Sequence, residues 1–103
     1  LLVAGHETVS SALSWTWYIL GQHPDIGANL LLELQAVLNG SSVTYDKLPQ
    51  LQYTRRIIDE TLRLYPPAWG MPRIALEDDE IKGYFIPKGS TINICQYIVH
   101  RHP

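Results

Sequence analysis

Apolar residues recur at helical spacing through the first two-thirds of the chain and give way to short extended runs after it. A first helix is predicted over residues 1–20, apolar on nearly every side, and Gly21 is predicted to end it. A second helix is predicted to begin at Pro24, because proline suits the first helical position, and to end at Gly40-Ser41-Ser42. Its apolar stripe consists of Ile26, Leu30, Leu34, Val37 and Leu38.

A third helix is predicted to end at Tyr65, because Pro66 donates no N–H and disfavours helical geometry in the residue before it. This helix carries Glu60 and Arg63, which lie three residues apart and therefore on one face. The opposite, apolar arc consists of Ile57, Ile58, Thr61, Leu62, Leu64 and Tyr65. Helical phase alone therefore indicates a solvated ion pair that contributes roughly 0–1 kcal/mol.

The remaining predicted elements are short. In chain order they are a helical turn over 44–48, an extended segment over 69–76, an acidic turn over 77–80, and strands over 81–86 and 90–99. Pro87-Lys88-Gly89 fits a type I turn with proline second and glycine fourth, so the last two strands are predicted to form a hairpin. The predicted fold class is mainly α with a small β hairpin, helical over 1–65 and strand or turn over 69–99.

The composition narrows the classes of function. With 46% hydrophobic and 17% charged residues, the chain is typical of a globular protein, and its net charge of −2 gives no reason to expect a nucleic-acid partner. The chain has no initial Met and starts directly in a periodic helix, so we expect an internal part of a longer protein and not a complete domain. The apolar run over 9–20 is too short to span a bilayer. A cytoplasmic location is favoured, with no N-terminus to show a membrane anchor.

A polar segment interrupts the first helix at Ala4, Gly5, His6, Glu7 and Thr8. The hydroxyl of Thr8 is predicted to bond back to the carbonyl of Ala4. Two interpretations are open: a proton-handling kink that faces a ligand, or a polar spot that is satisfied within a packed helix. His6 and Glu7 also begin a zinc-protease pattern, but Ser10 stands where the second histidine is needed, which excludes that site.

Cys95 and Arg73 are two further side chains that could carry chemistry. Cys95 is the only cysteine, which excludes an intrachain disulfide and a multi-cysteine metal site. It lacks the basic or helix-start surroundings that activate a thiolate, so it is predicted to be a small buried hydrophobe. Arg73 is the only Arg or Lys between Arg63 and Lys82, and by itself it is interpreted as a solvated strand residue.

Several motifs occur in order along the chain. Ala4-Gly5-x-Glu7-Thr8 is followed by Glu60-x-x-Arg63, then by Pro-Pro, a single Arg, and Gly-Tyr-x-Ile-Pro-Lys-Gly. In this order the motifs resemble the cytochrome P450 family. The likeness covers essentially all 103 residues, from the long helix that crosses the haem to the stretch just before the haem-binding loop. It implies that residues 1–103 are an internal part of a single cytochrome P450 domain.

The resemblance implies catalytic and cofactor roles for the first motif. Glu7 and Thr8 match the acid–alcohol pair that, in the family, helps deliver protons to bound dioxygen so that its O–O bond breaks heterolytically. Gly5 matches the position where the helix opens to make room for that oxygen, and Ala4 matches the small residue beside it.

The resemblance also implies roles for the later motifs. Glu60 and Arg63 match the family's buried ion pair, which holds the proximal side of the fold together and does no chemistry on substrate. Arg73 matches a basic residue that binds a haem propionate, a role suited to a guanidinium. The loop that lines the family's substrate pocket is matched by Ala68, Trp69, Gly70 and Met71.

The chain also departs from the family pattern. The family's axial ligand is a cysteine thiolate in a glycine-rich loop with a preceding Phe. Cys95 lies before that loop and lacks its surroundings, so the ligand of the haem iron is expected outside this chain and no metal ligand is assigned within it. His102 stands where the family commonly has Asp, and His6 is bulkier than many residues at its position.

The leading hypothesis is a haem-thiolate monooxygenase that inserts oxygen from O2 into an apolar organic substrate, with electrons from a ferredoxin- or flavoprotein-type redox partner. One alternative is a non-catalytic helical scaffold or binding module. Another is a family member that rearranges peroxides, against which the presence of both Glu7 and Thr8 argues. The isolated chain is predicted to fold marginally and to form no native haem site.

Overall fold

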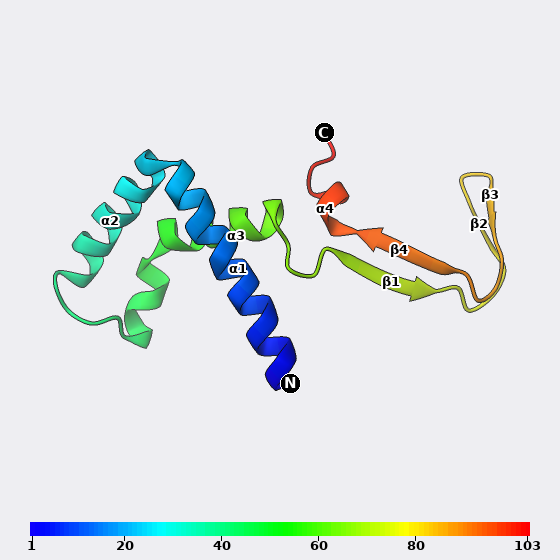
Figure 1. The fold of residues 1–103 in the computed structure, drawn as a ribbon, viewed down its shortest axis with the longest axis horizontal. Coiled ribbons are helices and arrows are strands. Elements are labelled where there is room, and N and C mark those ends of the chain that lie inside the picture. The colour runs from blue at the N-terminus through cyan, green and yellow to red at the C-terminus, as the bar shows by residue number, and fades with distance from the viewer. The chain divides into compact units, whose positions relative to one another are not determined.

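The computed structural model describes residues 1–103, which divide into two compact units, residues 1–67 and residues 68–103 (Figure 1). The first unit is helical, and the second consists of short strands and one helical turn. The chain is therefore mainly α with a small antiparallel β part, as its sequence predicts.

The helical unit contains α1 (Leu2–Gln22), α2 (Pro24–Leu38), the 3₁₀ helix η1 (Tyr45–Gln50) and α3 (Gln52–Leu64). Pro24 occupies the first turn of α2, as predicted. The predicted stop at Gly21 is wrong, because α1 continues to Gln22 and breaks at His23. The φ of −127° and ψ of 77° at His23 are not helical, which follows from the proline after it.

The other helix ends agree with the turn residues in the sequence. Asn39 closes α2 in the left-handed region, with φ 47° and ψ 45°, and its N–H donates to the Gln35 carbonyl at 3.0 Å. At the end of α3, Tyr65 leaves the helix with φ −132°, and its N–H donates to the Thr61 carbonyl at 2.7 Å. α3 therefore ends at Leu64, one residue before the predicted end at Tyr65, and Tyr65 is non-helical as the following Pro66 predicts.

The helical unit packs through few buried side chains. α1 contacts both α2 and α3, and the Trp15 ring of α1 stacks on the Tyr65 ring with centroids 4.2 Å apart and planes 7° from parallel. Only Leu51 and Thr61 are buried, at 7% and 1% exposure, whereas Trp17 is 70% exposed. The helices of this unit therefore leave much apolar surface open. None of the helices has both the length and the apolarity needed to cross a membrane.

The second unit holds two separate antiparallel pairs. β1 (Gly70–Ile74) pairs with β4 (Thr91–Cys95), and β2 (Asp79–Ile81) pairs with β3 (Tyr84–Ile86). The short helix α4 (Gln96–Val99) follows β4 directly. Figure 1 shows β1 and β4 as the longer pair and β2 and β3 as a narrow hairpin beyond it. Strands therefore form in this region as predicted, but their partners differ. The acidic turn predicted over 77–80 is wrong at Asp79 and Glu80, which belong to β2.

The predicted strand over 81–86 is wrong, because a tight turn divides it. Lys82 and Gly83 have φ values of 52° and 84°, and two successive positive φ angles are typical of a two-residue hairpin turn. The predicted strand over 90–99 is also too long, because it ends at Cys95 and pairs with β1. The local alternation of apolar and polar residues does not indicate that β4 pairs with the distant β1.

The turn at Pro87 also differs from its predicted form. The Ser90 N–H donates to the Pro87 carbonyl at 3.1 Å, so proline is the first turn residue and not the second. Gly89 is then the third, and its φ of 83° is the conformation that a type II turn requires there. Ala75 receives the Gly89 N–H at 2.9 Å and donates to the Ser90 carbonyl at 3.0 Å. This turn therefore closes the β1–β4 pair.

Candidate functional site

Glu60 and Arg63 form a two-point ion pair near the end of α3. The Nε of Arg63 donates to Oε2 of Glu60 at 2.7 Å, and Nη2 donates to Oε1 at 2.6 Å. The hydrogen bond from Arg63 lowers the pKa of Glu60 against the opposing effect of burial, and Coulomb attraction adds to the lowering. The same hydrogen bond raises the pKa of Arg63. The geometry is the bidentate form that fixes a guanidinium against a carboxylate.

The pair is open to solvent within these residues. The side chain of Glu60 is 56% exposed and that of Arg63 is 44% exposed, whereas Thr61 between them is 1% exposed. The Thr61 hydroxyl donates to the Ile57 carbonyl at 2.8 Å, which satisfies it in its buried position. Helical phase thus assigned Glu60, Arg63 and Thr61 to the correct faces of α3. It is wrong for Ile58 and Leu62 of the predicted apolar arc, which are 42% and 38% exposed. The buried surroundings that the resemblance implies for the pair are not formed by residues 1–103 and stay a prediction.

The predicted catalytic segment lies in the first turns of α1, where all of its residues are exposed. The Thr8 hydroxyl donates to the Ala4 carbonyl at 2.7 Å, which confirms the predicted backbone contact. The Gly5 N–H keeps its own bond, to the Leu1 carbonyl at 3.0 Å. A Cβ added at Gly5 would meet no atom within 4 Å, so no other part of the chain packs against the helix there.

No hydrogen bond joins the side chains of Glu7 and Thr8. Glu7 lines a shallow pocket of about 440 Å³ together with His6, Leu2 and Val3, whereas Thr8 does not line it. The carboxylate of Glu7 has no hydrogen-bond or ion-pair partner in the chain. The structure therefore joins Thr8 to Ala4 and leaves the acid of the predicted pair directed into solvent.

The predicted pocket and propionate residues lie on or beside β1 in the second unit. Ala68 and Trp69 are exposed, and the Met71 sulfur accepts a hydrogen bond from Gln96 Nε2 at 3.5 Å. A Cβ added at Gly70 would lie 3.0 Å from Asn93 Oδ1, so a larger residue would push against β4. Ala68 and Trp69 directly precede β1, and Gly70 and Met71 are its first two residues.

Arg73 supplies an open guanidinium on β1. Its Nη1 donates to the Pro72 carbonyl at 2.9 Å, and its side chain is exposed. No ion pair to an acidic residue occupies it. The remaining N–H groups of Arg73 can therefore bind an anionic group such as a carboxylate. This arrangement fits the predicted propionate contact without testing it.

The residues that the resemblance implies for a haem site lie on two separate units of the chain, and each is described alone. The open face of α1 at Gly5 leaves room for a ligand, and Arg73 offers donors for a carboxylate. No group of three or more His, Cys, Asp or Glu side chains is placed to hold a metal ion. Cys95 is half-buried at the end of β4. Gly5 and Arg73 therefore each fit the cofactor role that the resemblance implies, and these roles stay predictions.

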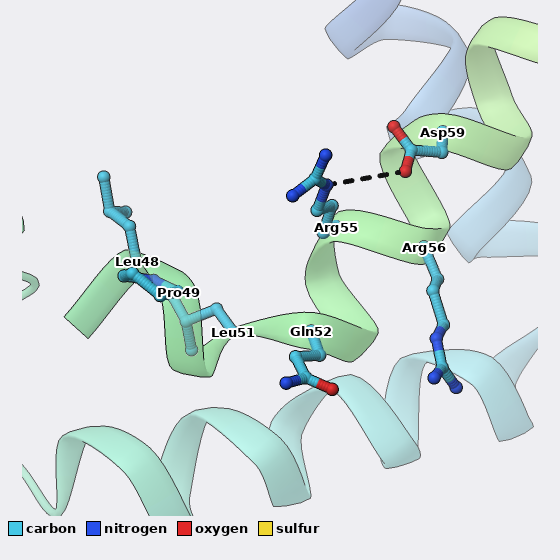
Figure 2. A pocket seen from close by; sticks show the side chains of 7 residues that line it. All are labelled: Leu48, Pro49, Leu51, Gln52, Arg55, Arg56 and Asp59. Atoms are coloured by element: carbon cyan, nitrogen blue, oxygen red, sulfur yellow. Dashed lines mark ion pairs between the residues drawn. The ribbon is translucent and has the colours of Figure 1, made fainter.

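A pocket that the sequence did not indicate lies where η1 meets α3 (Figure 2). Its volume is about 490 Å³, and Arg55 Nε lies 3.7 Å from Asp59 Oδ2 at its rim. Its lining consists of Leu48, Pro49, Leu51, Gln52, Arg55, Arg56 and Asp59. None of the predicted site residues belongs to this pocket, so it adds no support to the predicted chemistry.

Sequence reasoning also missed a polar contact between α2 and α3. Glu33 of α2 accepts hydrogen bonds from the N–H groups of Tyr53 and Thr54 and from the Thr54 hydroxyl. The one signal for this contact in the sequence is an acid placed among leucines at the centre of α2. A lone acid there does not identify its partner, because the partner is about twenty residues away in sequence.

Comparison with known proteins gives a match along the whole chain. The model of the cytochrome P450 family matches residues 1–103. Cyclooctatin synthase of Streptomyces melanosporofaciens is 44% identical over 100% of this chain and 22% of its own length. Pentalenene oxygenase of Streptomyces avermitilis is 42% identical over 99% of this chain and 23% of its own length. Cytochrome P450 3A5 of Homo sapiens is 46% identical over 99% of this chain and 20% of its own length. The chain thus spans about a fifth of the length of the curated relatives it matches.

Proposed function

Because this chain belongs to the cytochrome P450 family, we propose that the whole protein is a haem-thiolate monooxygenase. It would insert one oxygen atom from O2 into an apolar organic substrate, with electrons from a ferredoxin- or flavoprotein-type redox partner. The family match over residues 1–103, in which both Glu7-Thr8 and Glu60-x-x-Arg63 are present, carries this proposal. Relatives named as an oxygenase and a monooxygenase support it.

Arg73 and the loop before it are proposed to contact cofactor and substrate. When bound, the haem supplies the oxidising chemistry, with its thiolate ligand expected from a cysteine outside these residues. The open N–H groups of Arg73 would hold a propionate. Ala68, Trp69, Gly70 and Met71 would line the substrate side, where the 59% exposed ring of Trp69 offers apolar surface.

Thr8 and Glu7 are proposed to supply protons. Thr8 is held by its bond to Ala4, and its oxygen lone pairs stay free to accept a second hydrogen bond. By rotating its O–H away from Ala4, the same hydroxyl can donate to a ligand beside Gly5. Glu7 is exposed and has no partner in the chain, so its carboxyl can exchange protons with water. Together they would pass protons from solvent toward the Thr8 hydroxyl.

The proposal is tested in the whole protein by the change Thr8→Ala. We expect the variant to release more peroxide and less product per electron, because the hydroxyl that is proposed to pass protons to the site is missing. The measurement is product formed per electron consumed. Thr16→Ala is the matched control, since the Thr16 hydroxyl makes the same backbone contact, to the Ala12 carbonyl at 2.8 Å, two turns further along α1.

Two results would count against the proposal. Unchanged product per electron in the Thr8→Ala protein would remove the role of Thr8. A reduced, carbon-monoxide-treated sample of the unaltered whole protein without the red-shifted Soret band of a thiolate haem would remove the monooxygenase and favour a scaffold. The two measurements are independent, so a misassigned residue is distinguished from a misassigned function.

A further inference from the structure

The side chain of Glu33 reaches from the middle of α2 to the first turn of α3. Its Oε1 accepts the Tyr53 N–H at 2.6 Å, and its Oε2 accepts the Thr54 N–H at 2.8 Å and the Thr54 hydroxyl at 2.7 Å. These distances are in the short range of hydrogen bonds to an ionised acceptor. Both carboxylate oxygens are therefore used, on two adjacent residues of another helix.

The start of α3 needs this acceptor. The first N–H groups of a helix have no carbonyl partner within the helix, and side chains such as Ser or Asp at the N-cap commonly accept one of them. In α3 the N-cap residue is Leu51, whose side chain cannot accept a hydrogen bond, and no side-chain cap is formed there. A carboxylate is also favoured at the positive end of a helix dipole. Glu33 supplies the missing cap from a different helix.

The protonation of Glu33 agrees with this arrangement. Partial burial raises its pKa, but the hydrogen bonds from Tyr53, Thr54 and Gln52 together outweigh burial and leave the pKa below its ordinary value. None of the charged groups on the packed elements pairs with Glu33. Those groups are His6 and Glu7 on α1, Asp46 and Lys47 on η1, and Arg55, Arg56, Asp59, Glu60 and Arg63 on α3.

The Thr54 side chain that Glu33 contacts lies on the same face of α3 as the buried Thr61. Thr54 and Thr61 are seven residues apart, which is close to two full turns, so they share one face of the helix. Glu33 holds Thr54, and Thr61 on the same face is 1% exposed. Glu60 and Arg63 then lie on the other side. A rotation that released Thr54 would expose Thr61 and turn the Glu60–Arg63 pair inward.

We propose that Glu33 is a positioning residue: its carboxylate caps α3 from α2 and fixes the orientation in which that helix presents Glu60 and Arg63. This proposal builds on the proposed function, but only its haem readout depends on that function. Its own readout is local, namely the protection of the first amides of α3. Sequence and family resemblance assigned no role to this residue.

The test uses the whole protein and amide hydrogen exchange. In Glu33→Gln, exchange at Tyr53 and Thr54 is expected to rise by about tenfold or more, because hydrogen bonds to a charged acceptor are the strong class. Thr54→Val, which removes only the hydroxyl contact, is expected to give a smaller rise, and Thr54→Ser is expected to restore protection. Asp59→Asn is the control, because it removes an exposed charge of the same helix that does not touch Glu33.

The second readout is haem retention at rising temperature. Glu33→Gln is expected to release haem at a lower temperature than Asp59→Asn does. The proposal is overturned if exchange at Tyr53 and Thr54 is unchanged in Glu33→Gln, or if exchange rises while haem retention equals that of the control. If the unaltered protein holds no thiolate haem, the proposed function fails, while the exchange measurement still decides whether Glu33 caps α3.

Discussion

The two ends of α3 each hold an ionised glutamate, but by different means. At the start, Glu33 is half-buried and accepts hydrogen bonds from backbone and hydroxyl groups of Tyr53 and Thr54. At the end, Glu60 is 56% exposed and is held by Arg63. Both carboxyls have a lowered pKa. An equal direction of pKa shift therefore does not imply an equal contribution to stability.

The difference lies in what replaces each contact when it is lost. Water can solvate both Glu60 and Arg63, because both are exposed, so their pair contributes little within these residues. The Tyr53 and Thr54 amides have Glu33 as their acceptor, and a half-buried N–H that loses its partner is costly. The Glu60–Arg63 pair is also local in sequence and forms with the helix itself, whereas Glu33 joins two helices. Of the two contacts, only the one made by Glu33 therefore specifies tertiary structure.

The largest expected loss of stability follows from breaking the Glu60–Arg63 pair in the whole protein. If the rest of the protein covers this face, Glu60→Gln or Arg63→Met leaves an unpaired buried charge, and the free energy of unfolding is expected to fall by about 3–5 kcal/mol. Haem per protein and the thermal midpoint of the whole protein measure this, with Asp59→Asn as control. A loss below about 1 kcal/mol would show that the pair stays solvated there as well.

The helices were predictable because their ends depend on local chemistry. Pro24 begins α2, and Pro66 stops α3 at the residue before it, since proline restricts its own φ and the residue preceding it. The same effect explains the error at Gly21, because the break at His23 follows from Pro24 and not from the glycine. The inward position of Thr61 and the Thr8–Ala4 bond were also local inferences, and both are confirmed.

The strand partners and the Glu33 contact were not predictable from local pattern. β4 pairs with β1 across the intervening β2–β3 hairpin, and alternation of apolar residues does not encode which strand is the partner. The Lys82-Gly83 turn lacks the Asn-Gly or Asp-Gly pair that signals this turn most strongly. Glu33 meets Thr54 only after α2 and α3 have packed. The roles of Glu7, Thr8 and Arg73 came from family resemblance and stay predictions.

An intermediate loss of stability is expected when Glu33 is replaced, and its size depends on pH. Its pKa is lowered in the folded state, so its contribution is present above the pKa of an unfolded glutamate, about 4.3, and is lost as the pH falls through the lowered folded value. At neutral pH, Glu33→Gln is expected to cost about 1.5–3 kcal/mol. Urea unfolding of both proteins between pH 7 and pH 3 measures this.

The difference between the two unfolding curves isolates Glu33 from the other carboxyls. The stability gap between the unaltered protein and Glu33→Gln should be widest at neutral pH and should shrink as the pH falls below about 4.3. A stability gap that stays constant between pH 7 and pH 3 would contradict this prediction, because it would mean that the charge of the Glu33 carboxylate does not stabilise the start of α3.

The smallest effect is expected at Asp59, which lies between the two ends of α3. Arg55 Nε is 3.7 Å from Asp59 Oδ2, and the two side chains are 84% and 66% exposed (Figure 2). The acid also follows the base along the helix, which is the less favourable order for a pair four residues apart. Asp59→Asn should therefore change the free energy of unfolding by at most about 0.5 kcal/mol, and 1 M salt should remove even that. Urea unfolding at low and high salt measures both. A loss as large as that of Glu33→Gln would contradict the ranking, because it would mean that solvent exposure does not decide how much a carboxylate on this helix contributes.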